Sequence, residues 1–313
     1  MNHILVTGGS GLVGCALQRT LQCTEHENYK YTFVSSSDYD LTSMAETRKM
    51  FEKHSPNYVI HLAACVGGLY KNMNNKVQML EDNVDMNSNI VKCCHIYKVN
   101  KLIACLSTCI FPDKTTYPID ETMIHDGPPH HSNDAYAYAK RMLHIQCKAY
   151  REKYNDKFIC IIPTNIYGPN DNFNLEDGHV LPSLIHRCYL AKEKGIDFEV
   201  KGTGSPLRQF IYVDDVADLI MWTLKNYDDE SLILSVPEKD EVSIREVATS
   251  IAEKFDYADR IVFDDSFSDG QYKKTSDNSL LMNKIGYYKF TTLEDGLTDT
   301  VSWFKRNYYF SRK

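Results

Sequence analysis

Three separated segments carry residues whose types and spacing suit hydride and proton transfer. They are the glycine-rich run Thr7–Gly14, the triplet Ser107-Thr108-Cys109, and Tyr136-x-x-x-Lys140. A tyrosine four residues before a lysine shares one face of a helix with it, so a phenol and an ammonium can act together. A nearby cation lowers the pKa of a tyrosine and makes it a usable acid toward a carbonyl oxygen. The order of the three segments is the one that a dinucleotide-dependent reductase needs.

The glycine-rich run has the context of a dinucleotide-binding loop. The apolar residues Ile4–Val6 before it predict a buried parallel strand, and a helix is expected to begin at Leu12. Gly8 permits a tight turn, Gly11 permits close approach of a pyrophosphate, and Gly14 permits close packing of helix on strand. The helix N-terminus adds unpaired N–H groups and a positive dipole for the phosphates. The spacing G-x-x-G-x-x-G is the variant found in extended short-chain dehydrogenase/reductases.

Context distinguishes the pair Tyr136 and Lys140 from chance. The same spacing follows Tyr97 and Tyr309, so spacing alone is a weak indication. Tyr136, however, follows a predicted strand that ends at Ser107, whose hydroxyl can hold the same carbonyl oxygen. Lys140 can also bond the ribose of a nicotinamide cofactor. We therefore expect these three side chains to act together on a carbonyl group.

Cys109 and His179 form a candidate second acid/base pair. Cys109 lies two residues beyond Ser107, at the expected mouth of the crevice, where a thiolate is a competent base for a carbon acid beside a ketone. His179 precedes a predicted helix, whose N-terminus disfavours the imidazolium and suits a neutral proton carrier. Packing is the alternative for the cysteine, and a structural or solvent-facing position is the alternative for the histidine.

Composition is that of an ordinary soluble globular protein and does not indicate a nucleic-acid-binding or membrane protein. The chain has 313 residues and a net charge of −7, with no long basic run. No apolar stretch approaches the ~18 to 20 residues that span a bilayer, and the first strand begins too early for a signal peptide. The ten cysteines include adjacent Cys93 and Cys94 but no C-x-x-C metal pair. We expect reduced thiols, no bound metal and a cytoplasmic location.

The order of predicted elements indicates an α/β fold, a Rossmann doubly wound parallel sheet with a smaller interleaved α/β substrate domain. Strands and helices alternate through the first half, and crossovers of this length imply parallel strands. The predicted strands are 3–7, 31–35, 58–62, 102–107, 158–163 and 232–236; the predicted helices are 12–22, 43–54, 84–97 and 134–154, with another opened by 210–215. We expect a cofactor domain of 1–164 plus 209–237 and a substrate domain of 165–208 plus 238–313. Ligands should bind at the carboxyl ends of the strands.

Longer motifs carry a resemblance to a known family. The segments are Leu106–Pro112, Pro163–Pro169, Asp171–Phe173 and Gly178–Val180. Together they resemble the GDP-L-fucose synthase family of extended short-chain dehydrogenase/reductases, and the likeness extends from Ile4 to the Trp303-Phe304 region. Cys109 and His179 separate this family from related dehydratases, which usually carry an acidic pair after the serine or threonine.

The resemblance implies two reactions on GDP-4-keto-6-deoxy-D-mannose in one site. In the first, Cys109 acts as base at C3 and C5 and His179 returns a proton from the opposite face, while Ser107 and Tyr136 stabilise the enolates. In the second, NADPH delivers hydride to C4, Tyr136 gives the proton, and Lys140 supports both tyrosine and cofactor. The product is GDP-L-fucose.

The resemblance also implies two sets of binding residues. The cofactor set is Gly8, Gly9, Ser10, Gly11, Leu12, Val13, Gly14, Ser35, Ser36, Leu62, Ala63, Ala64, Leu106, Tyr136, Lys140, Pro163, Thr164, Asn165, Ile166 and His179. The substrate set is Ser107, Cys109, Asn165, Val180, Arg187, Lys201, Arg208, Asp269 and Lys274, whose arginines suit a diphosphate. Lys201 is a departure, because the family often has tryptophan there.

The second predicted strand bears on the choice between NADPH and NADH. It is followed by Ser35-Ser36-Ser37, with no carboxylate at its tip to bond a ribose 2′-hydroxyl, which leaves room for a 2′-phosphate. NADP(H) is therefore expected. Asp38 and Asp40 are close and no arginine stands nearby, so use of both cofactors stays open.

A homodimer is expected, and two alternative functions stay open. The helices 84–97 and 134–154 commonly form a four-helix homodimer interface in such enzymes, and Ile90, Val91, Met142 and Ile145 fit it, with core packing as the alternative. One rival function is a nucleotide-sugar 4-epimerase or 4,6-dehydratase, against which Cys109 and His179 argue. The other is a non-catalytic NADP(H) sensor, which typically loses the tyrosine or the lysine.

Overall fold

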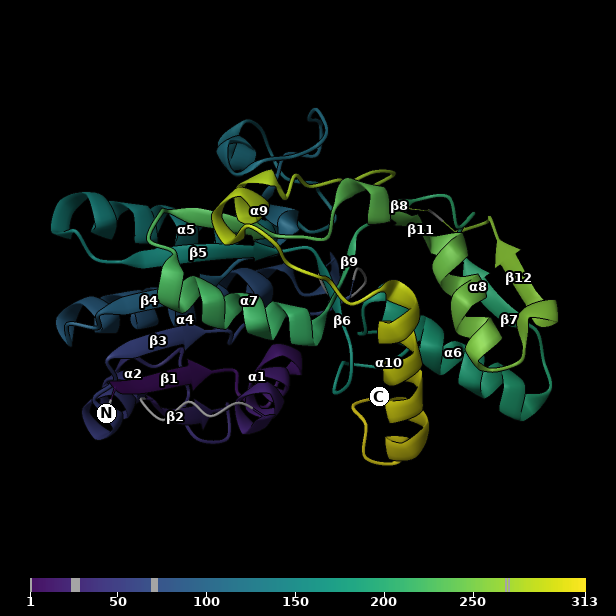
Figure 1. The fold of residues 1–313 in the computed structure, drawn as a ribbon, viewed down its shortest axis with the longest axis horizontal. Coiled ribbons are helices and arrows are strands. Elements are labelled where there is room, and N and C mark those ends of the chain that lie inside the picture. The colour runs from purple at the N-terminus through teal and green to yellow at the C-terminus, as the bar shows by residue number, and fades with distance from the viewer. Residues whose placement is uncertain (1, 24–28, 69–72, 268, 270) are drawn as a thin grey trace.

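A six-stranded parallel sheet forms the centre of the N-terminal part of the molecule (Figure 1). The computed structural model describes residues 2–23, 29–68, 73–267, 269 and 271–313. The strand order is β10-β5-β4-β3-β1-β2, and every neighbouring pair is parallel. The strands are β1 Asn2–Thr7, β2 Tyr29–Val34, β3 Tyr58–His61, β4 Lys101–Cys105, β5 Phe158–Pro163 and β10 Ser231–Leu234. The expected doubly wound Rossmann class is confirmed.

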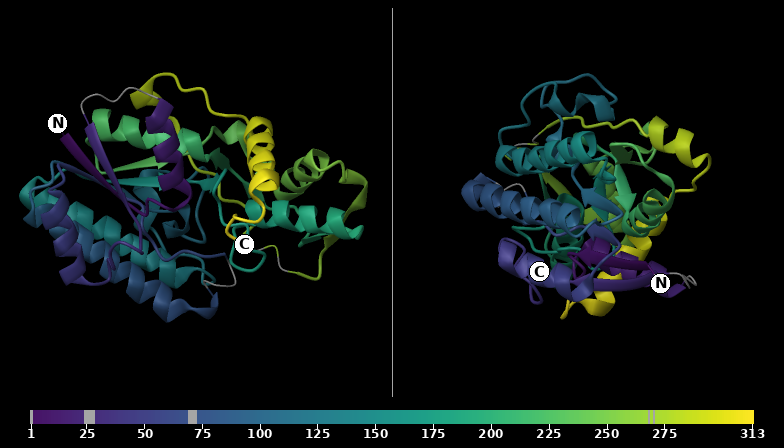
Figure 2. Two further views of the ribbon diagram at one scale, coloured as in Figure 1. Left: turned by 90° about the horizontal axis from the view of Figure 1, so that it is seen from below. Right: turned by 90° about the vertical axis from the view of Figure 1, so that its left-hand side faces the viewer.

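Helices cover both faces of this sheet (Figure 2). One face carries α1 Leu12–Cys23, α7 Val213–Asn226 and α9 Ser279–Ile285. The other carries α2 Met44–His54, α4 Lys76–Ile96 and α5 Asp134–Tyr154. Strand residues alternate between the two faces: Leu5 and Val59 pack into one core, and Ile4 and Ile60 pack into the other. Both faces are buried, which is why these strands are continuously apolar in sequence.

The chain order reverses between β1 and β3, and this point locates the ligand crevice. Because β2 lies outside β1 while β3, β4 and β5 continue on the other side, the loops after β1 and β3 diverge at the carboxyl edge. Open α/β sheets bind ligands at such a switch point. The glycine-rich segment follows β1 there, and Leu62 and Ala63 follow β3.

A second core lies beside the sheet and consists of shorter elements. It contains α6 Val180–Lys194, β7 Phe198–Lys201, α8 Ile244–Lys254, β12 Ile261–Asp264 and α10 Leu293–Asn307. The connecting strands are β6 Asn165–Tyr167, β8 Leu207–Arg208, β9 Phe210–Tyr212 and β11 Val242–Ser243. Short 3-10 helices are η1 Thr108–Ile110, η2 Glu121–His125, η3 Glu238–Asp240 and η4 Ala258–Arg260. The helices and strands of the second core come from three stretches of the chain, 180–201, 244–264 and 293–307, which alternate with α7 and α9 on the sheet, so the two parts are interleaved in sequence.

Two sequence expectations about packing need correction. Ile90 and Val91 are fully buried against the sheet, so they cannot contribute to a dimer interface. Met142 and Ile145 do face solvent, with 43% and 53% of their surface exposed. The strand expected to reach Ser107 ends at Cys105, and Ser107 instead caps η1.

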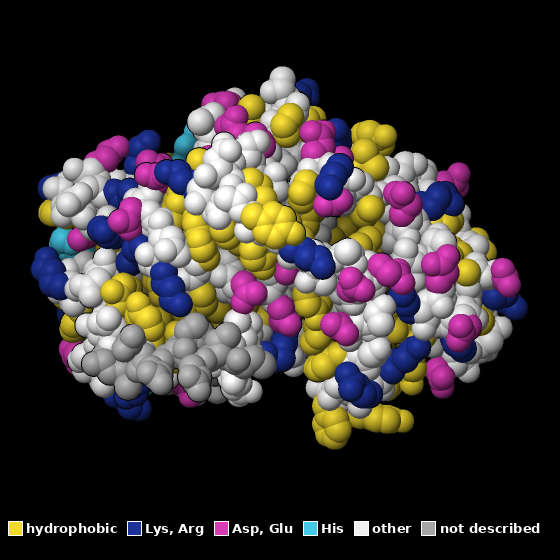
Figure 3. All heavy atoms as spheres, viewed as in Figure 1, with side chains coloured by type: hydrophobic (Ala, Val, Ile, Leu, Met, Phe, Trp, Pro, Cys, Tyr) yellow, Lys and Arg dark blue, Asp and Glu magenta, His cyan; other side chains and the backbone are white. Residues whose placement is uncertain are grey.

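One face of the molecule carries side chains of both charges among polar and apolar ones (Figure 3). On the face drawn in Figure 3, acidic and basic side chains are interspersed and form no continuous basic area. Within the described ranges, no helix is both long and apolar enough to cross a membrane.

Candidate active site

A cavity of about 1240 Å³ lies at the carboxyl ends of the sheet strands and extends to the second core. With one exception, all the residues expected to bind cofactor or substrate line it. Gly9 is the exception: its N–H donates to the Val34 carbonyl at 2.8 Å, and a Cβ there would lie 2.7 Å from Phe33 Cβ. Gly9 therefore joins the loop to β2 rather than facing a ligand.

The glycine-rich segment has the geometry of a phosphate-binding loop. Gly8 has a φ of +72°, and an added Cβ would lie 2.8 Å from the Ala63 nitrogen. A Cβ on Gly14 would lie 2.5 Å from the Gly8 carbonyl oxygen. The two glycines thus let the loop lie against both β3 and the first turn of α1, whose free N–H groups face the cavity. This close-packed loop fits a dinucleotide pyrophosphate.

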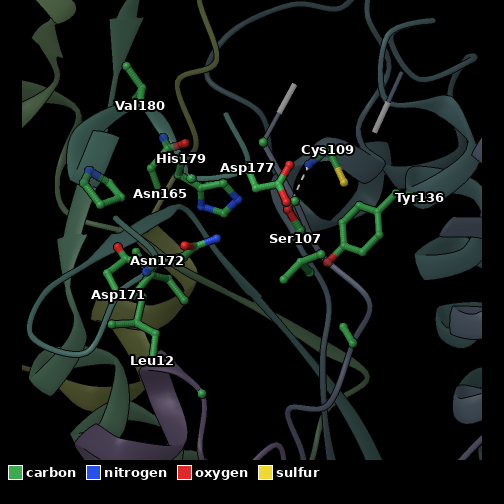
Figure 4. Close-up of a pocket in the computed structure, with 18 of the residues that line it drawn as sticks. Leu12, Ser107, Cys109, Tyr136, Asn165, Asp171, Asn172, Asp177, His179 and Val180 are labelled. Atoms are coloured by element: carbon green, nitrogen blue, oxygen red, sulfur yellow. Dashed lines mark hydrogen bonds between the residues drawn. The ribbon is translucent and has the colours of Figure 1, made fainter. Parts of the chain in front are cut away.

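Tyr136, Lys140 and Ser107 meet at the wall of the cavity. Tyr136 and Lys140 lie one turn apart on α5, and Lys140 Nζ is 5.7 Å from the centre of the tyrosine ring. Lys140 Nζ donates to the Cys105 carbonyl at 2.8 Å, which fixes the lysine against the end of β4. In Figure 4 the Tyr136 hydroxyl points toward Ser107. A carbonyl oxygen placed between these two hydroxyls would have two hydrogen-bond donors.

The sequence predicts that the Lys140 ammonium lowers the pKa of Tyr136, but in this structure that pKa is raised. Tyr136 is only 8% exposed, and burial raises its pKa well above the ordinary value, with the thiols of Cys109, Cys105 and Cys65 adding to the rise. Burial likewise lowers the pKa of Lys140. The phenol therefore keeps its proton at neutral pH, which suits a proton donor better than a base.

Cys109 lies on η1, next to Ser107 and 8% exposed. Its N–H donates to Ser107 Oγ at 3.4 Å, and Arg141 Nε donates to the Ile110 carbonyl at 2.6 Å, which attaches η1 to α5. Burial raises the pKa of the Cys109 thiol, while the Lys274 ammonium acts in the opposite direction. The net effect is a raised pKa, so only a minor fraction of the thiol is ionised at neutral pH.

His179 lies on the opposite wall from Cys109 (Figure 4). It caps α6, and its carbonyl accepts the Ser183 N–H at 3.1 Å. The pKa of the imidazole is lowered, as expected, but the cause is burial. A neutral imidazole takes a proton readily, and its protonated form then gives that proton up readily.

Two residues on this wall, Asn172 and Asp177, were not among the site residues predicted from the sequence. Asn172 and Asp177 line the cavity beside His179, and the Asp177 carbonyl accepts the Gly68 N–H at 2.8 Å (Figure 4). Asn165, which was predicted as a binding residue, donates a hydrogen bond from its side-chain nitrogen to the Gln209 carbonyl at 2.8 Å. Its side-chain oxygen is therefore left for a ligand. The only sequence signal for Asp177 was its place two residues before His179.

The far end of the cavity is basic. Arg187, Arg208 and Lys274 line it, and the pKa of Lys274 is lowered by burial while Cys109 and Arg208 also act on it. Arg208 donates to the Gln271 carbonyl at 2.6 Å, which orients its guanidinium. Asp269 accepts from the Thr203 N–H and hydroxyl, both at 2.8 Å. Its sequence neighbours Ser268 and Gly270 lie outside the described residues.

Comparisons with known proteins agree with this geometry. The model of the NAD dependent epimerase/dehydratase family matches residues 4–234. A GDP-L-fucose synthase of Dictyostelium discoideum is 52% identical, covering 99% of this chain and 97% of the relative. The chain belongs to this family, as a member of its GDP-L-fucose synthase branch.

Two further relatives extend the likeness. A probable GDP-L-fucose synthase of Drosophila melanogaster is 46% identical, with complete coverage of both chains. The crystal structure of a GDP-L-fucose synthetase from Naegleria fowleri bound to NADP has a TM-score of 0.95 and 49% identity, covering 100% of this chain and 95% of that one. The family recognised from the motifs is confirmed.

The turn that follows β2 in the cavity lining carries hydroxyl and carboxyl side chains. Ser35 and Ser36 line the cavity after β2. The Asp38 carboxylate accepts from the Ser35 N–H and hydroxyl, both at 2.8 Å, and these bonds lower its pKa. Asp38 therefore holds the serine turn in shape and is itself ionised at neutral pH.

Asp171, which follows β6, is a buried carboxyl group in the cavity wall. It is 5% exposed; its Oδ1 accepts the Asn172 N–H at 2.7 Å, and its Oδ2 has no hydrogen-bond partner among the described residues. Burial raises its pKa to about 7, with the bond from Asn172 and the charge of Arg312 acting the other way. In the unfolded chain the pKa is about 4. Stability should therefore fall as pH rises from about 4 to 7, because only the unfolded chain releases the proton in that interval.

Asp171→Asn is expected to stabilise the fold at high pH. At pH 8 the substitution removes the penalty of about 4 kcal/mol for ionising the buried carboxyl. The asparagine introduces a buried amide N–H without a partner, which lowers the free energy of unfolding by about 2 kcal/mol. We expect a net gain of about 2 kcal/mol at pH 8 and none at pH 5, measured by urea unfolding. The exposed Asp259→Asn serves as control. An equal effect of Asp171→Asn at both pH values would contradict the buried charge.

Proposed function

We propose that this chain converts GDP-4-keto-6-deoxy-D-mannose to GDP-L-fucose by 3,5-epimerisation followed by NADPH-dependent reduction at C4. The observation that carries the proposal is the meeting of Ser107, Cys109, Tyr136 and His179 around one cavity. That cavity has a glycine-rich phosphate loop at one end and the cations of Arg187, Arg208 and Lys274 at the other. The name of the Dictyostelium relative is consistent with this chemistry.

In the proposed epimerisation, Cys109 removes the protons on C3 and C5, which the C4 ketone acidifies. Its thiolate is the minor form, so it is a strong base when it forms. His179 is on the other wall, and it gives a proton to the opposite face of the sugar from its protonated form, which burial makes the minor form. That form arises when His179 takes up a proton as the Cys109 thiol releases one, and the two groups return to thiol and neutral imidazole after the step. The hydroxyls of Ser107 and Tyr136 donate to the enolate oxygen at C4.

In the proposed reduction, NADPH supplies the hydride when bound. Tyr136 gives its proton to the C4 oxygen, and its raised pKa keeps that proton available at neutral pH. Lys140, held by the Cys105 carbonyl, stabilises the resulting phenolate. The cofactor is held by the glycine loop and by Leu106, Pro163 to Ile166 and the serine turn after β2.

The remaining substrate contacts and the compartment are part of the same proposal. Arg187, Arg208 and Lys274 bind the diphosphate, while Asn165 and Val180 contact the sugar. The reducing cytoplasm is the proposed compartment, supported by the absence of any disulfide bond among the cysteines that the structure describes. Thiol chemistry at Cys109 requires such a setting.

We further propose a homodimer formed through α4 and α5. These two helices pack against each other and expose Val77, Leu80, Tyr138, Met142 and Ile145. A second copy of the same helix pair would bury these residues in a four-helix interface. Sedimentation velocity at micromolar concentration should give twice the chain mass, and a single-chain mass would overturn the dimer.

Turnover of the keto-sugar by the purified wild-type chain tests the function. We expect NADPH oxidation with GDP-4-keto-6-deoxy-D-mannose and a product identified as GDP-L-fucose. NADH run alongside measures the cofactor preference, which should be modest because the described residues at the serine turn include no arginine or lysine. Oxidation to an unepimerised sugar would remove the roles of Cys109 and His179. NADPH binding without turnover would favour a 4-epimerase or a sensor.

A further inference from the structure

Cys109 and Tyr136 belong to different elements, and one buried side chain joins those elements behind the site. Tyr136 and Lys140 are part of α5, whereas Cys109 lies on η1. Arg141 is only 7% exposed, and its Nε donates to the Ile110 carbonyl at 2.6 Å. Ile110 is the last residue of η1 and follows Cys109 directly. One helix therefore carries the proposed proton donor for reduction and also holds the segment that carries the proposed base for epimerisation.

The hydrogen bonds within η1 are longer than the bond from Arg141. The Cys109 N–H lies 3.4 Å from Ser107 Oγ, and the Ile110 N–H lies 3.2 Å from the Ser107 carbonyl. Both bonds are local, so they shape η1 without fixing its distance from α5. Hydrogen bonds from N–H to oxygen are most favourable near about 3 Å and weaken as they lengthen. The short bond from Arg141 therefore fixes η1 relative to α5.

The other end of this segment is held by the sheet. The Leu106 N–H donates to the Ile161 carbonyl at 2.8 Å, so the chain is still attached to β5 one residue before Ser107. Loss of the Arg141 bond would therefore free the Cys109 end of η1 and leave the Ser107 end in place.

The guanidinium also acts on the thiol by its charge. Burial lowers the pKa of Arg141, while Tyr138 and the Cys109 thiolate act in the opposite direction. An electrostatic interaction between two groups is reciprocal, so the Arg141 cation favours the thiolate form of Cys109. The ammonium groups of Lys274 and Lys140 favour the same form.

We propose that Arg141 is a positioning residue for the epimerisation, which sets the place of the Cys109 thiol relative to Tyr136 and favours its thiolate. The inference rests on the proposed function and goes beyond it by naming a residue on which one of the two reactions depends. Arg141 does not line the cavity, so it acts through Ile110 and Cys109 rather than on the substrate. A displacement of about 1 Å at a reacting group can cost about a hundredfold in rate.

Two substitutions separate the hydrogen bond from the charge. In Arg141→Gln the side-chain nitrogen is as many bonds from Cα as the arginine Nε, so the donor to Ile110 is kept and the charge is removed. Arg141→Met has a side chain without a donor or a charge. Arg141 Nη2 has no hydrogen-bond partner among the described residues, so neither substitution leaves a partner of that atom unbonded.

Proton exchange and NADPH oxidation are measured separately on each variant. At pH 8, Arg141→Met should lower deuterium incorporation at C3 and C5 about a hundredfold, because the thiol is displaced. NADPH oxidation should persist and yield a 6-deoxy sugar that is not epimerised. Arg141→Gln should recover about tenfold of the lost exchange, because its donor again holds Ile110.

The pH profile of exchange reports the charge. Between pH 7.5 and 10, exchange by Arg141→Gln should level off at a higher pH than exchange by the wild type, because the thiolate has lost a neighbouring cation. His125 on η2 also faces Arg141, and its pKa is lowered by burial and by that cation. His125 is therefore neutral across this range and does not contribute to the profile.

Arg151→Met is the matched control. Arg151 is on the same helix, and its guanidinium also donates to backbone carbonyls, those of Phe158 at 3.3 Å and Asp228 at 2.7 Å, outside the cavity lining. Both activities should stay at the wild-type level in this control. NADPH binding in isothermal titration calorimetry checks that each variant is folded. If Arg141→Met fails that check, the pH profile of Arg141→Gln decides, and a profile equal to that of the wild type would overturn the inference.

Three further results would count against Arg141 while wild-type turnover stands. They are exchange at the wild-type rate in Arg141→Met, an equal loss of exchange and oxidation in that variant, and exchange in Arg141→Gln as slow as in Arg141→Met. A wild-type chain that shows neither exchange nor oxidation with the keto-sugar would overturn the proposed function as well.

Discussion

Tyr136→Phe is expected to reduce NADPH oxidation by about a thousandfold while leaving proton exchange at C3 and C5 in place. The phenol is buried and its pKa is raised, so it is protonated throughout the neutral range. Phenylalanine fills the same volume but has no proton to give to the C4 oxygen. Exchange continues because Cys109 and His179 remain, although it loses one of the two hydroxyls that hold the enolate.

The two activities are measured separately on the same sample. NADPH oxidation follows the absorbance of the cofactor, and exchange follows deuterium incorporation from D₂O into the keto-sugar without cofactor. Tyr138→Phe is the matched control, since Tyr138 is on the same helix and 44% exposed. Unchanged oxidation in Tyr136→Phe would assign the proton to another group. Equal loss of both activities would indicate a disrupted site rather than a missing proton donor.

The central sheet and its cofactor loop could be predicted because their determinants are local. Ile4–Val6 followed by glycines and a helix start specifies a strand, a turn and a phosphate loop over a short segment. Alternating strands and helices with long crossovers then require a parallel sheet. The observed β1 and α5 agree closely with the predicted ranges.

Burial and the partners of side chains could not be predicted in the same way. Ile90 and Val91 lie on the face of α4 that meets the sheet, which the apolar pattern of that helix does not distinguish from an outer face. The pKa of Tyr136 rises because the residue is desolvated and lies near the thiols of Cys109, Cys105 and Cys65, and desolvation depends on the whole surrounding fold.

Contacts between segments that are distant in the sequence could not be predicted either. Phe267 faces Lys201 because β12 pairs with β7, and neither short strand has a strong sequence signal. Asp177 reaches the site through a loop whose shape depends on the Gly68 N–H. The motif residues were predictable because the family resemblance carries them, whereas the features particular to this chain required the structure.

Cys109→Ser is expected to produce the converse of Tyr136→Phe. A serine hydroxyl is a much weaker acid than a thiol, so the base at C3 and C5 is lost and exchange falls by about a hundredfold or more. Tyr136, Lys140 and Ser107 are unaffected, so hydride transfer to C4 continues. NADPH oxidation should therefore persist and yield a 6-deoxy sugar that is not epimerised.

The pH dependence of the wild-type enzyme gives an independent check on the thiolate. Burial raises the pKa of Cys109, so the thiolate fraction, and with it the rate of exchange, should increase as pH rises from 6 to 9. Reduction should change little over the same range, because the raised pKa of Tyr136 keeps its proton in place. Cys93→Ser, whose thiol contacts Met44 outside the cavity, controls for the loss of a buried thiol. Exchange at the wild-type rate in Cys109→Ser would make Cys109 a packing residue and transfer the base to another group on the same wall.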